Sequence, residues 1–420
     1  MMTGEAVTPP VTIFLRSILG NPHLAAYVQT LRLAGDDSFY DDWRFHESLP
    51  KLSWNGTGST LDRAVSLVTE LPLPYTQAWV RGLQEGTMDA IIALILTRLP
   101  NLRSLVTTAN FTKEMTLQGA MFHSALCGQN RVGWLSHFDQ LGEVCADFYR
   151  SYNHGFNPNT DILLSLFYLP AIQTLDLLLD NPAKFSWPAA TAPDTTSLTS
   201  LTLRHVRESA LKEILSCTKR LIKLDWQFLY SERNMSTQYR GPRLYPPIAD
   251  LDVLVDALAP VRNTLKDLTI RADAIQPAQL DYEELIEVRG SLEGLVEFNV
   301  ERLQVPLTFL AGRLIPNNRF RVSERIPKTV RTLVIGDDLR DFGDMFLDED
   351  DWDRSEIALN LRDWLCEGLG STPFIEQLEL GMLSDTRKGQ IYCILKRLLD
   401  KEQIPVKITL RGKEPEPESA

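Results

Sequence analysis

The sequence has few cysteines, and none of them stands in a Cys-x-x-Cys pair. The total of five is odd, which argues against a framework built only of paired disulfides. Reduced thiols are typical of compartments in which glutathione and thioredoxin keep cysteine reduced. We therefore expect a cytoplasmic or nuclear protein. The cysteines are Cys127, Cys145, Cys217, Cys366 and Cys393.

Groups that bind metals or carry out catalysis are also scarce. The six histidines are scattered, and none forms a His-x-x-x-His pair with a nearby acid. Gly56-Thr57-Gly58-Ser59 lacks the lysine of a phosphate-binding loop, so a turn is the simpler interpretation. No Gly-x-Ser-x-Gly elbow is present. We expect a protein that is not an enzyme and that holds no cofactor and no metal.

An excess of positive charge and a long apolar run are both missing. The formal net charge is −12, whereas a nucleic-acid-binding surface is basic. The apolar run at residues 11–19 contains Arg16, and that at residues 88–99 is shorter than the roughly 20 residues of a membrane helix. We expect neither a nucleic-acid nor a membrane partner. The acidic balance favours either solubility or a protein partner of basic character.

The clearest pattern that is present lies at residues 198–226. Leu198-x-x-Leu201-x-Leu203 alternates as a strand does, and a short amphipathic run with Ala210 and Leu211 follows. Leu221-x-x-Leu224-x-Trp226 then repeats the first pattern, with Leu224 lying 23 residues after Leu201. This spacing is typical of one leucine-rich repeat, a strand and a helix that stack on their neighbours.

Looser copies of this unit run along the chain, each strand pattern being separated from the next by a helical pattern or a loop. The sequence predicts an α/β leucine-rich-repeat-like solenoid, a horseshoe with irregular long repeats, over residues 11–411. Disordered ends are expected at 1–10 and 412–420. The alternative fold is a doubly wound sheet. Other expected strands lie at 28–33, 102–105, 141–144, 172–177, 265–270, 295–300, 330–335, 375–380 and 406–410. The main expected helices lie at 11–19, 61–70, 77–98, 112–127, 161–168, 248–259, 355–369 and 386–399.

Alternate residues of each expected strand point away from the core and form a broad surface. The candidate binding residues on it are Asp176, Arg204, Lys223, Asp225, Asp267, Arg271, Glu297 and Glu301. Their mixture of charges suits selective recognition of a protein. An ordinary hydrated sheet face is the alternative interpretation.

Two acidic stretches follow expected strand ends and would lie on one rim of a horseshoe. The first, residues 36–54, adds the candidates Asp37, Tyr40 and Trp43. The second, residues 337–356, is rich in carboxylates but lacks the spacing of a calcium loop. Each is a candidate site for a basic partner segment, with a solvated loop as the alternative.

Residues 12–33, with the sequence TIFLRSILGNPHLAAYVQTLRL, resemble a segment of fungal F-box proteins with leucine-rich repeats. Residues 305–312 and 326–339 are similar to later pieces of the same proteins. The resemblance implies the substrate-recognition half of a ubiquitin-ligase receptor. An F-box is not expected, because about ten residues precede Val11 and Leu71-Pro72 lies mid-chain. We therefore do not expect the cullin adaptor to bind. The alternative function is a small-molecule enzyme on the doubly wound sheet.

Overall fold

The computed structural model places strands and helices along most of the chain, in two compact units, Met1–Leu198 (unit 1) and Thr199–Ala420 (unit 2). It describes residues 10–34, 51–54, 58–107, 111, 115–128, 135–146, 163–179, 185–204, 206–231, 248–275, 287–311, 321–336, 354–367, 370–381 and 395–410. The predicted disordered tail at 412–420, residues 1–9 of the predicted disordered start, and the acidic candidates Asp37, Tyr40 and Trp43 lie outside these ranges. Pro10 begins the first helix.

Unit 1 contains four short parallel strands that follow the order of the chain: β1 (Thr30–Leu33), β2 (Ser104–Thr107), β3 (Glu143–Ala146) and β4 (Thr174–Leu178). Pairing aligns Leu31, Leu105, Val144 and Leu175 in one row. All four are buried. These are the residues that the strand patterns predicted to point inward.

The helices of unit 1 are α1 (Pro10–Gly20), α2 (Pro22–Ala25), α3 (Gly58–Thr69), α4 (Thr76–Glu85), α5 (Met88–Thr97) and α7 (Thr116–Leu126), with a 3-10 helix at Ser165–Tyr168. The single helix predicted over 77–98 is wrong, because α4 ends at Gly86 with φ of 72°. A side chain at Gly86 would meet the Leu52 carbonyl, so glycine fits this turn. Asp89 of α5 accepts hydrogen bonds from Leu117 N (2.7 Å) and Gln118 N (3.0 Å) and so caps α7.

Unit 2 contains seven parallel strands in chain order: β5 (Ser200–Arg204), β6 (Lys223–Ser231), β8 (Asp267–Ile275), β10 (Arg302–Pro306), β11 (Thr332–Gly336), β12 (Gln377–Gly381) and β13 (Lys407–Leu410). Leu201 and Leu224 are paired, as the 23-residue repeat predicted. The main-sheet strands of both units, eleven in the described residues, are all parallel and follow the order of the chain. A doubly wound sheet would reverse that order, so the α/β repeat solenoid is confirmed and the alternative fold is wrong.

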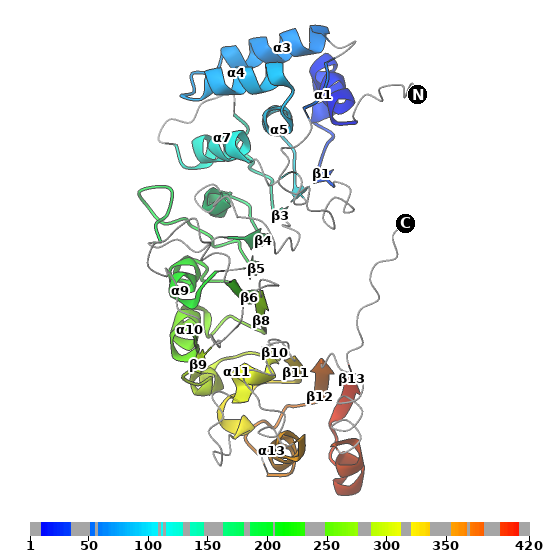
Figure 1. Cartoon of the computed structure of the whole chain (residues 1–420), viewed down its shortest axis with the longest axis vertical. Helices are drawn as coiled ribbons and strands as arrows, with labels where there is room; N and C mark the ends of the chain where they lie inside the picture. Colours follow the sequence, from blue (N-terminus) through cyan, green and yellow to red (C-terminus); the bar gives the residue numbers. More distant parts are fainter. Residues whose placement is uncertain are drawn as a thin grey trace, which may run out of the picture. The chain divides into compact units, whose positions relative to one another are not determined.

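The helices of unit 2 are α9 (Glu208–Cys217), α10 (Leu251–Leu258), α11 (Leu307–Ala311) and α13 (Arg354–Glu367), and residues 395–402 are also helical. In Figure 1, α9 and α10 lie along one side of the strands. Short 3-10 helices occur at Ala259–Val261, Glu293–Glu297 and Val322–Glu324. These elements cover the buried leucines that a strand cannot cover alone.

A small second sheet pairs β7 (Ile248–Asp250) with β9 (Glu287–Arg289). The helix predicted from residue 248 therefore begins three residues later, where the Asp250 side chain accepts a bond from Val253 N (3.0 Å).

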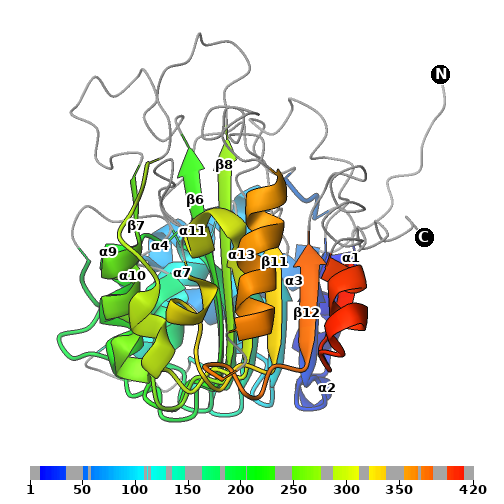
Figure 2. The same ribbon diagram turned by 90° about the horizontal axis from the view of Figure 1, so that it is seen from below.

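The strand predicted at 295–300 is also wrong. Glu293–Glu297 is a 3-10 helix, and the strand is β10, in which Leu303 aligns with Leu268 of β8. The repeat pattern is thus Val300-x-x-Leu303-x-Val305, five residues later than predicted. Strand length varies as well: β6 and β8 have nine residues each and pair over their full length, rising above their neighbours in Figure 2.

Candidate functional site

The surface of interest is the face of the unit 2 strands that is turned away from the buried leucines, here called the sheet face. Pairing places its side chains in rows that run across the strands. One row carries Lys223, Asp267 and Arg302 on β6, β8 and β10. Two residues further along each strand, Asp225, Thr269 and Gln304 form the next row. A third row joins Arg204, Gln227 and Arg271 on β5, β6 and β8.

Ion pairs cross the strands within this grid. Arg271 Nη2 donates to Asp225 Oδ2 on β6. Arg302 Nη1 donates to Asp267 Oδ1 at 3.2 Å and to Thr269 Oγ1 at 3.4 Å. Opposite charges on neighbouring strands stabilise a sheet by a few tenths of a kcal/mol to about 1 kcal/mol each. The larger effect is that each carboxylate fixes the orientation of a guanidinium group.

The sheet face contains five of the residues that we predicted to bind a partner: Arg204, Lys223, Asp225, Asp267 and Arg271. Asp176 lies on β4 of unit 1, where its Oδ2 accepts a bond from Cys145 Sγ at 3.6 Å. It is outward-facing as predicted but belongs to the other unit.

Glu297 and Glu301 are not outward residues of a strand, so their predicted placement is wrong. Glu297 ends the 3-10 helix at Glu293–Glu297, and Glu301 immediately precedes β10. Both lie before the strand because the repeat pattern was taken five residues too early. They make ion pairs there: Glu301 with Lys266 at 3.0 Å and Glu297 with Lys328 at 3.7 Å.

Sequence reasoning missed Arg302 and Gln304, which occupy the two outward positions of β10 described above. The signal was present, because Val300, Leu303 and Val305 repeat the spacing of Leu265, Leu268 and Ile270. It also missed the outward charges of the last strands, Glu379 on β12 and Lys407 on β13.

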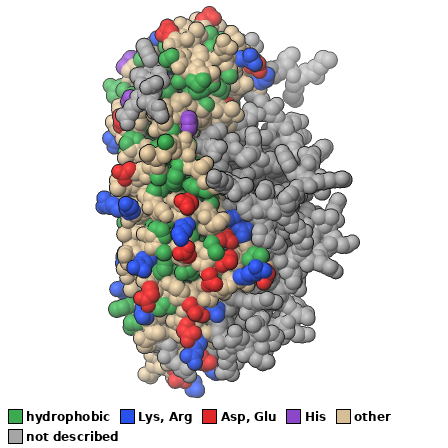
Figure 3. All heavy atoms as spheres, turned by 90° about the vertical axis from the view of Figure 1, so that its left-hand side faces the viewer, with side chains coloured by type: hydrophobic (Ala, Val, Ile, Leu, Met, Phe, Trp, Pro, Cys, Tyr) green, Lys and Arg blue, Asp and Glu red, His purple; other side chains and the backbone are tan. Residues whose placement is uncertain are grey.

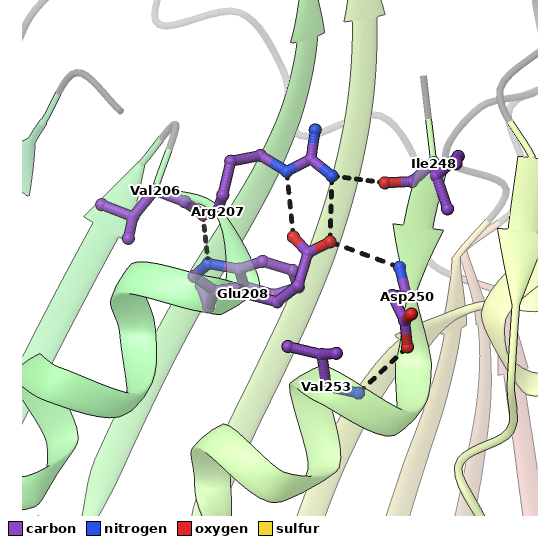
Figure 4. A network of polar contacts seen from close by, with 7 residues as sticks. Val206, Arg207, Glu208, Ile248, Asp250 and Val253 are labelled. Atoms are coloured by element: carbon purple, nitrogen blue, oxygen red, sulfur yellow. Dashed lines mark hydrogen bonds and ion pairs between the residues drawn. The ribbon is translucent and has the colours of Figure 1, made fainter. Parts of the chain in front are cut away.

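A buried ion pair anchors the loop that follows β5 (Figure 4). Arg207 donates from Nε to Glu208 Oε2 at 3.0 Å and from Nη2 to Glu208 Oε1 at 2.9 Å. The same Nη2 donates to the Ile248 carbonyl of β7, and Glu208 Oε1 accepts from Asp250 N at 3.3 Å. The Arg207 guanidinium also lies 4.8 Å from the centre of the Phe228 ring. The network therefore joins α9, β6 and β7.

The opposite side of unit 2 also carries charges of both signs. The lower part of Figure 3 shows basic and acidic side chains interspersed on the helical side of unit 2. Lys212 of α9 pairs there with Asp256 of α10 at 2.6 Å, and both side chains are largely exposed. Exposed pairs of this kind contribute little to stability, about 0–1 kcal/mol.

Across the described ranges, no group of three or more His, Cys, Asp or Glu side chains is placed to hold a metal ion. Within the same ranges, none of the helices has the length and apolar character needed to cross a membrane. Four cysteines there are free thiols: Cys127, Cys145, Cys217 and Cys366. Burial raises the pKa of the Cys127 thiol, and a hydrogen bond with Ser165 partly offsets this effect.

Comparison with known families agrees with the fold. No curated protein matches the chain. Residues 3–299 match the family model described as a leucine-rich repeat domain. The register of β10, β11, β12 and β13 continues the same repeat beyond residue 299. Domains of this family are generally non-catalytic modules that bind proteins. With parallel strand–helix repeats in both units and a match over more than half of its length, the chain belongs to the leucine-rich repeat family.

Proposed function

We propose that this protein is a non-enzymatic scaffold that binds a protein partner on the sheet face of unit 2. The observation that carries the proposal is the grid of outward side chains centred on β6 and β8, in which ion pairs fix the arginines. Fixed polar groups lose little conformational entropy when a partner binds, which favours affinity and selectivity.

The resemblance of residues 12–33 to F-box proteins with leucine-rich repeats narrows the proposal. The helix α1, the Asn21-Pro22 stop and the strand β1 occur in the order that the resemblance implies. We assign the chain the role of the substrate-recognition part of such a ubiquitin-ligase receptor. Contact with the cullin adaptor is not part of this role. The Leu71-Pro72 pair lies in the turn between α3 and α4, where Leu71 is buried.

The proposed place of action is the cytoplasm or nucleus, which the free thiols of the described residues support. The alternative, a small-molecule enzyme, depended on a doubly wound sheet. Such a sheet binds ligands where the strand order reverses, and the strands of each unit follow the chain without reversal. No observation favours this second function.

Site-specific photo-crosslinking tests the proposal. A benzophenone side chain introduced at Thr202 or Gln227, both on the sheet face, is expected to capture the same partner protein in cells. The matched control is Glu213, an exposed residue of α9 on the helical side. If the partner were captured from Glu213 and not from Thr202 or Gln227, the sheet face would not be the binding surface.

A further inference from the structure

The balance of charge on the sheet face is opposite in sign to the net charge of the whole chain. On β5, β6, β8 and β10 its described side chains include four cations, Arg204, Lys223, Arg271 and Arg302, and two anions, Asp225 and Asp267. The whole chain has a formal net charge of −12. The other outward residues of these strands whose side chains the structure describes carry no charge, and Asp273 of β8 is not among them. Cations therefore outnumber acids on this part of the surface.

The basic side chains of this face are also more exposed to solvent than the acidic side chains with which they pair. The Asp225 side chain is 15% exposed, whereas the Arg271 side chain with which it pairs is 45% exposed. The Asp267 side chain is 27% exposed and that of Arg302 is 36% exposed. The carboxylates thus lie deeper than the guanidinium groups that they orient. In both ion pairs the positive group is the more exposed partner.

These cations still have hydrogen-bond donors to offer. A guanidinium group has five N–H donors. The contacts in the described residues use one nitrogen of Arg271 and one nitrogen of Arg302. Lys223 is exposed, and its ammonium group makes no hydrogen bond or ion pair with the part of the chain that the structure describes.

The spacing of the three cations decides what kind of anion fits. Neighbouring strands lie about 4.8 Å apart, so Lys223 on β6 and Arg302 on β10 are roughly 10 Å apart at the backbone. Arg271 is four residues beyond Asp267 on β8, about 13 Å along the strand. One phosphate or one carboxylate cannot reach all three. In an extended peptide, side chains on one side repeat about every 6.8 Å, so two acids separated by two such steps, about 13.6 Å, match the roughly 13 Å that separates Arg271 from the row of Lys223 and Arg302.

We propose that Lys223, Arg271 and Arg302 bind an extended acidic segment of the partner protein, with Asp or Glu at alternate positions. This inference rests on the proposed function and names the chemistry of its partner. It differs from the basic partner that we expected from the net charge and from the acidic stretches, which stays a prediction. The net charge of the whole chain does not predict the local charge of the sheet face, where the arginines are held by ion pairs.

Binding of two labelled peptides to the full chain tests this inference by fluorescence anisotropy. The probes are Glu-Ser-Glu-Ser-Glu-Ser-Glu and its counterpart with Lys in place of Glu. At low salt we expect the acidic peptide to bind at least about tenfold more tightly, with affinity falling as salt rises. The double variant K223Q/R271Q is expected to weaken its binding about tenfold.

The matched control is K212Q/R289Q, which removes the same charge from other exposed ion pairs of unit 2. It is expected to change the affinity by less than about twofold. Since Arg271→Gln leaves Asp225 unpaired, the single variant K223E provides a second test that breaks no described contact. Unchanged binding by K223E would overturn the inference. Equal binding of both peptides, or tighter binding of the Lys peptide, would also contradict it.

A single-stranded oligonucleotide of matched charge separates an acidic peptide from polyanions in general. If the oligonucleotide bound more tightly than the acidic peptide and lost affinity in K223E, the inference would be wrong. The crosslinking experiment distinguishes failure of this inference from failure of the proposed function. If Thr202 captured a partner through a segment without acidic residues, the sheet face would still be the binding surface. Only the inference that the bound segment is acidic would then be wrong.

Discussion

Leu201 and Leu224 are equivalent residues of neighbouring repeats, and both are completely buried. Thr202, between the two inward leucines of β5, is partly exposed on the sheet face. The alternation of inward and outward residues separates two tasks along one strand. Inward residues determine stability, and outward residues are those that we propose to select the partner.

The first stability prediction compares these two positions. Leu201→Ala should lower the free energy of unfolding by about 2–5 kcal/mol, because it leaves a cavity against fully buried neighbours. Thr202→Ala should change it by less than about 0.5 kcal/mol, as an ordinary surface substitution does. Urea denaturation of both variants measures the difference. A larger loss for Thr202→Ala would mean that the strand register is shifted by one residue.

Single residues also show how much of the face could be predicted. Arg204, Lys223, Asp225, Asp267 and Arg271 were predicted correctly because each lies beside a leucine or isoleucine of a clear pattern. The pairing of Arg271 with Asp225 was not found, because it joins strands that are 46 residues apart in sequence. A pattern within one strand contains no information about its neighbour.

At the scale of elements, β10 shows why one strand was misplaced. Leu295, Phe298 and Val300 have the same spacing as Val300, Leu303 and Val305, and all five residues are buried. Burial alone therefore does not show which of these two sets of residues forms the strand. The pairing of Arg302 with Asp267 shows that it is the second set. Likewise, α10 looked longer because Ile248 extends the apolar spacing of the helix, although it pairs with Glu287 in a strand.

The element prediction concerns the Arg207–Glu208 pair between α9 and β7. Both side chains are less than 10% exposed, so removing one partner leaves an uncompensated buried charge. Arg207→Met should lower the free energy of unfolding by about 3–5 kcal/mol, and R207M/E208Q should lower it by less than the sum of the single changes. Chemical denaturation of the double-mutant cycle measures this coupling.

The control for this cycle is the exposed pair between Arg321 and Glu324, 3.4 Å apart. Arg321→Met should cost less than about 1 kcal/mol. Additive effects at Arg207 and Glu208 would indicate that the two side chains stabilise the protein independently, contrary to the geometry in Figure 4.

At the scale of the molecule, the sequence predicted one continuous array over residues 11–411. The structure packs the chain into two compact units that share the same repeat. The sequence pattern does not reveal a division at residue 198, because Leu198 is itself the first leucine of a clear repeat. Such a division depends on the density of tertiary packing, which a local spacing of leucines does not encode.

The last prediction concerns how far the destabilisation caused by one substitution extends along the strands of unit 2. Each repeat is stabilised mainly by its nearest neighbours. In Leu201→Ala, amide hydrogen exchange should therefore accelerate most in β5 and β6, less in β8 and β10, and least in β12 and β13. Hydrogen exchange followed by mass spectrometry measures this order. Equal acceleration in all seven strands would indicate that unit 2 opens as one cooperative block.

The regular pairing of the strands also has an evolutionary consequence. The repeats of β5 and β6 align residue by residue over five positions, so each repeat adds one column to the grid on the sheet face. Duplication of a repeat would widen that grid by about 4.8 Å without altering the columns already present. Mutations at positions such as Thr202 or Gln227 could change the ligand while leaving the buried leucines untouched. A lineage could therefore acquire new specificities by small, separable steps.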